Sequence, residues 1–110
     1  EISACLVGSE MCIRDSSIPT RFATLAHELG HIFCGHCGPH NRGAWPDRSK
    51  LPHGVRETEA EAVAYLVCAR RELQVASQEY LSELIADVDL RQVSLYAIFE
   101  AANRIEGKSQ

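Results

Sequence analysis

One stretch, TRFATLAHELGHIFCGH at residues 20–36, constrains the fold more than any other part of this 110-residue chain. Its apolar residues recur at three- and four-residue spacing, which is typical of a helix with one buried face. These residues are Phe22, Leu25, Ala26, Leu29, Ile32 and Phe33. Ser17 is suited to cap this helix, and Pro19 to its first turn. Gly35, Gly38 and Pro39 are expected to end it.

Three further segments carry helical patterns, at about 55–71, 77–88 and 90–107, the last one stopping near Gly107. The residues expected to face the core there are Ala60, Val63, Ala64, Val67, Cys68, Leu81, Leu84, Ile85, Val93, Leu95, Ala97, Ile98, Ala101, Ala102 and Ile105. Residues 38–54 are rich in glycine and proline, so they form a long loop, and loops of that length are usually functional or mobile. We therefore expect a mainly α chain of about four helices.

The composition indicates one globular domain with a single modest core, since 45% of the residues are hydrophobic and 24% are charged. A net charge of −4 argues against nonspecific nucleic-acid binding, which needs a concentrated basic face. No apolar run approaches the ~20 residues of a membrane span. The five cysteines come without a secretion signal, so free thiols in a cytoplasmic protein are expected.

The segment LVGSEMCIRDS, residues 6–16, resembles the in-frame translation of a transposon adapter used in preparing sequencing libraries. The alternative is a native strand and turn, but we favour excluding residues 1–16 from the fold as non-native and expect a partial domain at residues 17–110. Three cysteines then remain, Cys34, Cys37 and Cys68. The natural protein is expected to continue upstream with a different N-terminal part.

The motif HELGH places His27 and His31 four residues apart. Four residues make about one helical turn, so both imidazoles project from the same side and can share one cation. Glu28 lies ~100° around the helix from His27, where it could meet a metal-bound water without being a ligand. Zn²⁺ lowers the pKa of such a water to ~7, and Glu28 would take its proton as the water attacks a carbonyl.

The next helical segment offers a third ligand in ETEAEA. Glu57 and Glu61 are four residues apart and share a face, whereas Glu59 points away. Glu57 would be the ligand and Glu61 would accept the other N–H of a ligand histidine. Alternatively, all three are surface charges at a helix N-terminus, where acids favour the helix dipole. Beside HELGH we favour the ligand interpretation, and two imidazoles with one carboxylate favour zinc.

A structural zinc knuckle is a competing interpretation of the same stretch. Cys34, Cys37 and His40 are spaced like the beginning of such a site. A closed structural site needs four ligands, however, and no second CxxC or HxxxH follows. Cys34 also continues the buried side of the first helix and is expected to be a small core residue.

Other histidines and aromatic residues have weaker claims. His36 comes nine residues after the first motif histidine, near 180° away on an ideal helix, so it is expected to face elsewhere. His40 and His53 could donate to an oxyanion, but exposed loop histidines usually have no such role. The hydroxyl of Tyr65 could approach the site, but we favour the alternative that Tyr65 is a half-buried core residue. Trp45 is expected to anchor the loop by packing.

Taken together, RFATLAHELGHIFCGH, the loop with WPDR and ETEAEAVAYLVCAR resemble the ImmA/IrrE-type metallopeptidases, a zincin group related to prokaryotic antirestriction and phage-repressor regulation. The resemblance runs from about residue 20 to residue 105. It implies that both motif histidines bind zinc, that Glu28 is the catalytic base and that a glutamate of the ETEAE block is the third ligand. Glu57, supported by Glu61, fits that spacing, and Glu59 is the alternative register.

The resemblance implies a zinc-dependent metalloendopeptidase that acts on a protein or peptide, such as a DNA-binding repressor, with no direct contact to nucleic acid. This chain would then be the helical part of an α+β zincin-like fold whose β-sheet half lies upstream and is largely missing. Without a sheet edge, extended peptide binding by strand addition is in doubt. The alternative function is a non-catalytic regulatory module that keeps the metal site and binds a partner protein.

Overall fold

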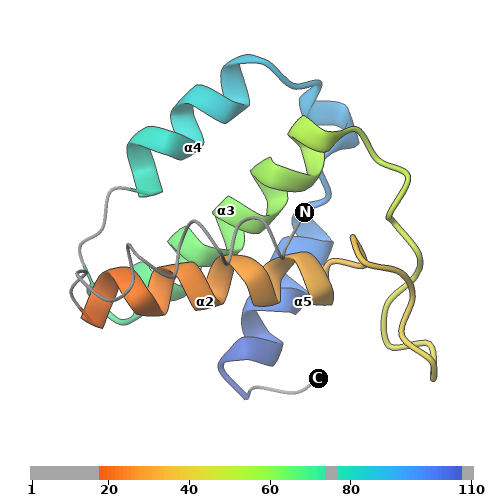
Figure 1. Ribbon diagram of the computed structural model, residues 1–110, viewed down its shortest axis with the longest axis horizontal. Helices are drawn as coiled ribbons and strands as arrows, with labels where there is room; N and C mark the ends of the chain where they lie inside the picture. Colours follow the sequence, from red (N-terminus) through yellow and green to blue (C-terminus); the bar gives the residue numbers. More distant parts are fainter. Residues whose placement is uncertain (1–17, 74–76, 108–110) are drawn as a thin grey trace.

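The computed structural model describes residues 18–73 and 77–107, with side chains described from residue 80 onward in the second range. These residues form the helices α2 (Ile18–Phe33), α3 (His53–Arg70), α4 (Ser77–Ala86) and α5 (Leu95–Ile105) and a 3₁₀ helix, η1 (Leu90–Gln92) (Figure 1). No strand occurs in these two ranges, which confirms the prediction of a mainly α chain with about four helices. The predicted adapter-derived segment and the Ser17 cap lie outside the described residues.

Helix α3 is the centre of the fold, because it contacts each of the other three helices, and α2 also contacts α5 (Figure 1). The buried core lies where α2, α3 and α5 meet and consists of Cys34, Val63, Val67, Ile98, Ala101 and Ala102. Alanines dominate the α5 side of this core, so the helices approach closely. The long segment between α2 and α3 runs along one side of the helical assembly (Figure 1).

A glycine sets the distance between α2 and α3. A Cβ atom on Gly30 would lie 3.1 Å from the Val63 Cβ and 3.3 Å from the Ala60 backbone. Both contacts are tighter than ordinary van der Waals packing, so only glycine allows the present separation. The close approach brings the HELGH turn of α2 next to the first turns of α3.

The C-terminal end of α2 is a Schellman turn, which the sequence predicted only as a glycine stop. Gly35 has a φ of +82°, a conformation that glycine adopts without strain. The backbone N–H of Gly35 donates to the Ile32 carbonyl at 3.1 Å, and that of His36 donates to the His31 carbonyl at 2.9 Å. The turn therefore folds His36 back toward the last helical residues.

The buried face of α2 differs from the predicted apolar stripe. Leu25 is 56% exposed and Ile32 is 38% exposed, whereas Gly30 and His31 are buried. The predicted stripe is therefore wrong at both exposed positions. Small size at Gly30 and polar contacts between the two helices turn the HELGH side of α2 toward α3, although that side does not coincide with the apolar stripe.

The predicted last helix, 90–107, is divided into two pieces. Ser94 has an extended backbone, with φ −101° and ψ 110°, and its hydroxyl accepts the backbone N–H of Ala97 as an N-cap. Helix α5 therefore begins only at Leu95. The core positions predicted for Leu95 and Ile85 are wrong, since these side chains are 66% and 38% exposed.

Candidate metal centre

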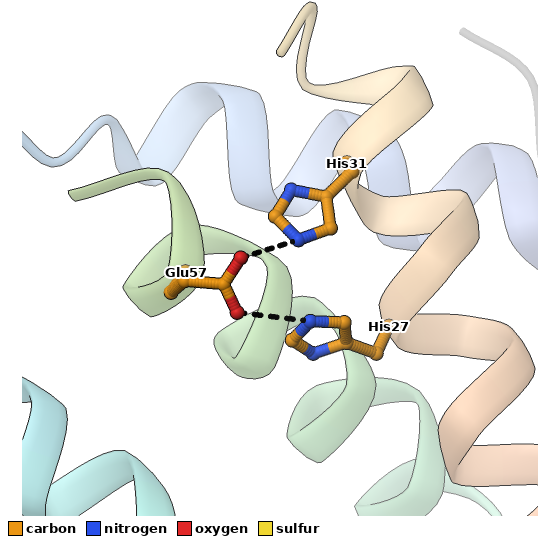
Figure 2. Close-up of side chains that lie close together, drawn as sticks. All are labelled: His27, His31 and Glu57. Atoms are coloured by element: carbon orange, nitrogen blue, oxygen red, sulfur yellow. Dashed lines mark ion pairs between the residues drawn. The ribbon is translucent and has the colours of Figure 1, made fainter. Parts of the chain in front are cut away.

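Three side chains predicted as ligands lie together at the α2–α3 contact (Figure 2). The Nε2 atom of His27 is 3.3 Å from Glu57 Oε1, and the Nε2 atom of His31 is 3.0 Å from Glu57 Oε2. The carboxylate thus lies between the two imidazoles, which project from successive turns of α2 (Figure 2). The exposed side-chain fractions are only 13%, 7% and 12% in the order His27, His31, Glu57. The spacing argument predicted this convergence, while the ligand role stays a prediction.

Glu61 contacts the far side of the first imidazole. Its Oε1 atom lies 2.8 Å from His27 Nδ1, and since an ionised carboxylate only accepts, Nδ1 carries the proton and donates it. Glu61 lies one turn after Glu57 on α3, so the four-residue spacing puts both carboxylates on the same imidazole. In the neutral ring this contact leaves the Nε2 lone pair directed into the cluster, as a ligand histidine requires.

His36 supports the second imidazole, contrary to the prediction that it faces elsewhere. Its Nδ1 atom lies 2.9 Å from His31 Nδ1, and its Nε2 atom lies 2.7 Å from Glu59 Oε1. The prediction was wrong because it extended an ideal helix beyond Phe33, whereas the chain turns at Gly35. Glu59 points away from the three-residue cluster, as expected, and belongs to a second cluster.

The donor set of His27, His31 and Glu57 fits a Zn²⁺ ion. Tetrahedral coordination at ~2.0–2.1 Å per bond separates neighbouring ligand atoms by roughly 3.3 Å, and the two N···O distances here are 3.3 and 3.0 Å. With the Nδ1 atoms protonated, both Nε2 lone pairs face carboxylate oxygens, which is repulsive unless a proton or a cation lies between them. Zinc is therefore a chemically suitable occupant of this cluster.

The pKa values of His27 and Glu57 also indicate that a positive charge is favoured between the imidazoles and the carboxylate. Burial lowers the pKa of His27, but the contacts with Glu57 and Glu61 outweigh it and raise that pKa to about 9. The contacts of Glu57 with the imidazoles of His27 and His31 hold the pKa of Glu57 well below its usual range. A proton on His27 thus occupies the place of a cation, and metal binding has to displace it.

Glu28 lies beside the cluster with its carboxylate unsatisfied. The residue is 7% exposed, and neither carboxylate oxygen has a hydrogen-bond partner among the described residues. Buried polar groups without partners are rare in folded proteins and call for a functional or chemical reason. Glu28 lines a cavity of about 240 Å³ together with Thr20, Ala23, Thr24, His27, Glu57, Glu61 and Tyr80. A water or a substrate group in this cavity could satisfy the carboxylate.

A second cluster of metal-binding side chains, formed by Cys34, His36 and Glu59, is fully buried. Arg48 donates to both Glu59 oxygens, at 2.7 and 2.6 Å, so this carboxylate already has a permanent cation as its partner. Burial, with the nearby Glu59 charge, raises the pKa of the Cys34 thiol to about 12, so it stays protonated. Because Arg48 already balances the charge of Glu59 and zinc would have to displace the thiol proton, we interpret this cluster as structural.

The knuckle interpretation finds no support in the geometry. Cys34 is buried in the core, whereas Cys37 is exposed, and neither cluster of possible ligands in the described chain includes Cys37 or His40. His40 Nδ1 instead accepts the backbone N–H groups of residues 42 and 44. Its ring lies 4.6 Å from that of Trp45, which also contacts Phe33, so Trp45 anchors the loop as predicted.

Two aromatic predictions need correction. Tyr65 is 38% exposed and does not line the cavity, so it is not the half-buried core residue near the site that was expected. Tyr80 of α4 lines the cavity instead. Sequence reasoning missed Tyr80 because nothing in its own segment shows that α4 reaches the site. His53 is exposed and begins α3, away from the residues that line the cavity.

No family model, curated protein or solved structure matches this chain. The similarity to the ImmA/IrrE-type metallopeptidases therefore rests on the sequence motifs alone. Within the part of the chain that the structure describes, no helix is long and apolar enough to cross a membrane.

Proposed function

We propose that this chain is a zinc-dependent metallopeptidase domain of the ImmA/IrrE type, the helical part of a zincin-like fold. The observation that carries the proposal is the convergence of His27 Nε2, His31 Nε2 and the Glu57 carboxylate beside the unpartnered carboxylate of Glu28. A structural zinc site would close its coordination with a fourth protein ligand. Here three ligands lie next to a cavity and a potential base, which is the arrangement of a hydrolytic site.

The residues divide the work of peptide hydrolysis as follows. His27, His31 and Glu57 would hold the ion, which when bound would supply the Lewis acidity that acidifies water and polarises a carbonyl. A Glu28 oxygen takes one proton from the attacking water and delivers it to the leaving amine nitrogen.

The proposed substrate is a peptide bond in a protein. The resemblance to the ImmA/IrrE-type enzymes adds a DNA-binding repressor as the kind of protein that would be cut. Direct contact with nucleic acid and membrane attachment are not part of the proposal. Three free cysteines, Cys34, Cys37 and Cys68, suit a reducing compartment, and we propose the cytoplasm.

A single substitution tests the chemistry. The full chain loaded with zinc should hydrolyse members of a quenched fluorescent peptide library at pH 7, and Glu28→Gln should lower that rate by about 10²–10⁴-fold. Zinc content, measured on the same samples by elemental analysis, should not change, because Glu28 is not a ligand. Glu83→Gln is the matched control, since it makes the same chemical change on an exposed part of α4.

The same measurement separates the enzyme from a non-catalytic module that keeps the metal site. An enzyme loses hydrolysis in Glu28→Gln and keeps its zinc. Zinc-loaded wild-type protein that cuts no peptide of the library, or that cuts as fast after Glu28→Gln, would contradict the catalytic proposal. One bound zinc without hydrolysis would favour the non-catalytic module.

A further inference from the structure

The second cluster is connected to the candidate metal centre through His36. The connection begins at Arg48, in the long segment between α2 and α3. Its two terminal nitrogens donate to the two oxygens of Glu59, which is 0% exposed. Bidentate arginine–carboxylate pairs have a fixed geometry, so the position of Arg48 determines that of Glu59.

Glu59 accepts four hydrogen bonds, two from Arg48, one from the Ser94 backbone N–H at 2.8 Å and one from His36 Nε2 at 2.7 Å. With four donors around it, the carboxylate is ionised and only accepts. The Nε2 atom of His36 must therefore carry a proton. Glu59 thus determines which nitrogen of His36 is the donor.

The tautomer of His36 in turn determines which nitrogen of His31 carries a proton. Arg48 already balances the charge of Glu59, so nothing in the cluster requires a second cation, and His36 is a neutral ring with a lone pair on Nδ1. That lone pair faces His31 Nδ1 at 2.9 Å, and a short N···N contact is favourable only when one nitrogen donates. His31 Nδ1 is therefore the donor, and the His31 Nε2 lone pair faces Glu57.

The same arginine fixes the segment that follows α2. Arg48 Nη1 donates to the Cys34 carbonyl at 3.0 Å, and the Arg48 backbone N–H donates to the Gly35 carbonyl at 2.9 Å. Gly35 lies against Pro46 so closely that a Cβ atom would collide with the Pro46 carbonyl oxygen. The loop is thus held against the turn that carries His36.

A buried ion pair often stabilises the fold no more than well-packed apolar residues of similar volume would, so stability alone does not explain this one. A metal ligand, by contrast, gains affinity when a hydrogen bond fixes its ring, and such supporting partners contribute about 10–100-fold. We propose that Arg48, Glu59 and His36 are positioning residues that hold His31 in the tautomer able to bind zinc. Through them, zinc binding and ordering of the 34–52 segment are coupled. The inference rests on the proposed metal centre and not on hydrolysis.

Zinc affinity tests this connection through Arg48, Glu59 and His36, which we call the relay. Competition with a chromophoric chelator at pH 7 should show about 10–100-fold weaker zinc binding in His36→Leu. His36→Gln should retain most of the affinity, because an amide can donate to Glu59 and accept from His31 at the same time. Val67→Ala is the control for general loss of packing, since Val67 is a buried core residue outside the relay, and its zinc affinity should equal that of wild type.

Hydrogen exchange measures the coupling between zinc binding and the order of the 34–52 segment. By thermodynamic reciprocity, zinc should slow hydrogen exchange of the Arg48 backbone amide in wild type by the same factor that the relay adds to zinc affinity. Arg48→Lys keeps the charge but loses the two-pronged contact, so it should weaken both zinc binding and the protection of the loop. It also serves as the second relay variant if His36→Leu does not fold.

The outcomes separate this inference from the proposed function. Wild-type protein that binds no zinc overturns both. Wild-type protein that binds zinc, with equal affinity in the relay variants and in Val67→Ala, overturns the relay alone. Weaker binding in His36→Leu and Arg48→Lys, with rescue in His36→Gln, supports it.

Discussion

Two clusters of histidine and glutamate lie side by side in this protein and differ in what balances their charge. The inner cluster, the second cluster described above, contains His36 and Glu59, and Arg48 balances the charge of Glu59. The outer cluster joins His27, His31 and Glu57 beside a cavity and includes no arginine or lysine. Both have the residue types of a metal site, but only the inner one has a guanidinium group that balances its carboxylate.

The difference shows that ligand-type residues at a suitable spacing do not define a metal site by themselves. A buried carboxylate with a guanidinium partner has little to gain from a metal ion. A carboxylate between two imidazole nitrogens is suited to bind one. Of the four predictions below, three change one cluster at a time and the last changes an exposed ion pair; they run from the largest expected effect to the smallest.

Removing the permanent cation should affect stability most. Arg48→Met leaves Glu59 buried without its charge partner, and we expect the free energy of unfolding to fall by about 3–5 kcal/mol. Urea denaturation of the metal-free protein measures this change. A loss below ~1 kcal/mol, the range of exposed ion pairs, would show that the inner cluster is not held by this pair.

Zinc should stabilise the outer cluster. At a free zinc concentration 100-fold above the dissociation constant, binding adds about 2.7 kcal/mol to the free energy of unfolding. We expect that gain in wild type and none in Glu57→Ala, as measured by thermal or urea unfolding with and without zinc. Equal zinc-dependent gains in the two proteins would remove Glu57 from the ligand set.

The metal-free protein should have a pH-dependent stability that depends on His27. Its pKa, ordinarily 6.5, is raised to about 9 in the folded protein because the two glutamate contacts outweigh burial. This contribution is complete below pH 6.5 and is lost as the pH rises to about 9. Glu57, whose pKa is lowered, contributes above its ordinary value of 4.5 and loses its contribution as the pH falls.

We therefore expect the free energy of unfolding, measured in chelator, to decrease between pH 6.5 and 9. His27→Asn should flatten this decrease because it removes the titrating group. Retention of the full slope in His27→Asn would assign the pH dependence to another group.

An exposed ion pair gives the smallest effect and a baseline for Arg48. Arg91 contacts Asp89 at 3.0 Å, but its side chain is 89% exposed. Arg91→Met should change the free energy of unfolding by less than ~0.5 kcal/mol. Urea denaturation under the conditions used for Arg48→Met measures the difference between a buried and an exposed pair directly.

Much of this architecture follows from local patterns, and what escaped prediction has physical causes. The helices follow from apolar spacing, and the meeting of His27 and Glu57 follows from two four-residue repeats that face each other. The contact from His36 depends on the left-handed turn at Gly35, which an ideal helix does not represent. The partner of Glu59 comes from a loop arginine, and no periodicity predicts where a loop side chain points.

The apolar stripe of α2 is wrong at two positions for a different reason, while Ala26 is buried and Phe22 and Phe33 pack against the core as predicted. Leu25 and Ile32 belong to the most hydrophobic face of this helix, yet the packed face is the one that carries Gly30 and His31. Close approach at a glycine and polar contacts to α3 outweigh the local pattern. Tertiary contacts of this kind are not encoded in a single segment.

Zinc content per chain tests the central claim most directly. Wild type, Glu57→Ala and Cys34→Ala would be stripped with chelator, reloaded with excess Zn²⁺ at pH 7, freed of unbound metal and measured by elemental analysis. We predict one zinc per chain in wild type and in Cys34→Ala, and none in Glu57→Ala. No zinc in wild type, or its loss in Cys34→Ala with retention in Glu57→Ala, would contradict the assignment of the outer cluster as the metal centre.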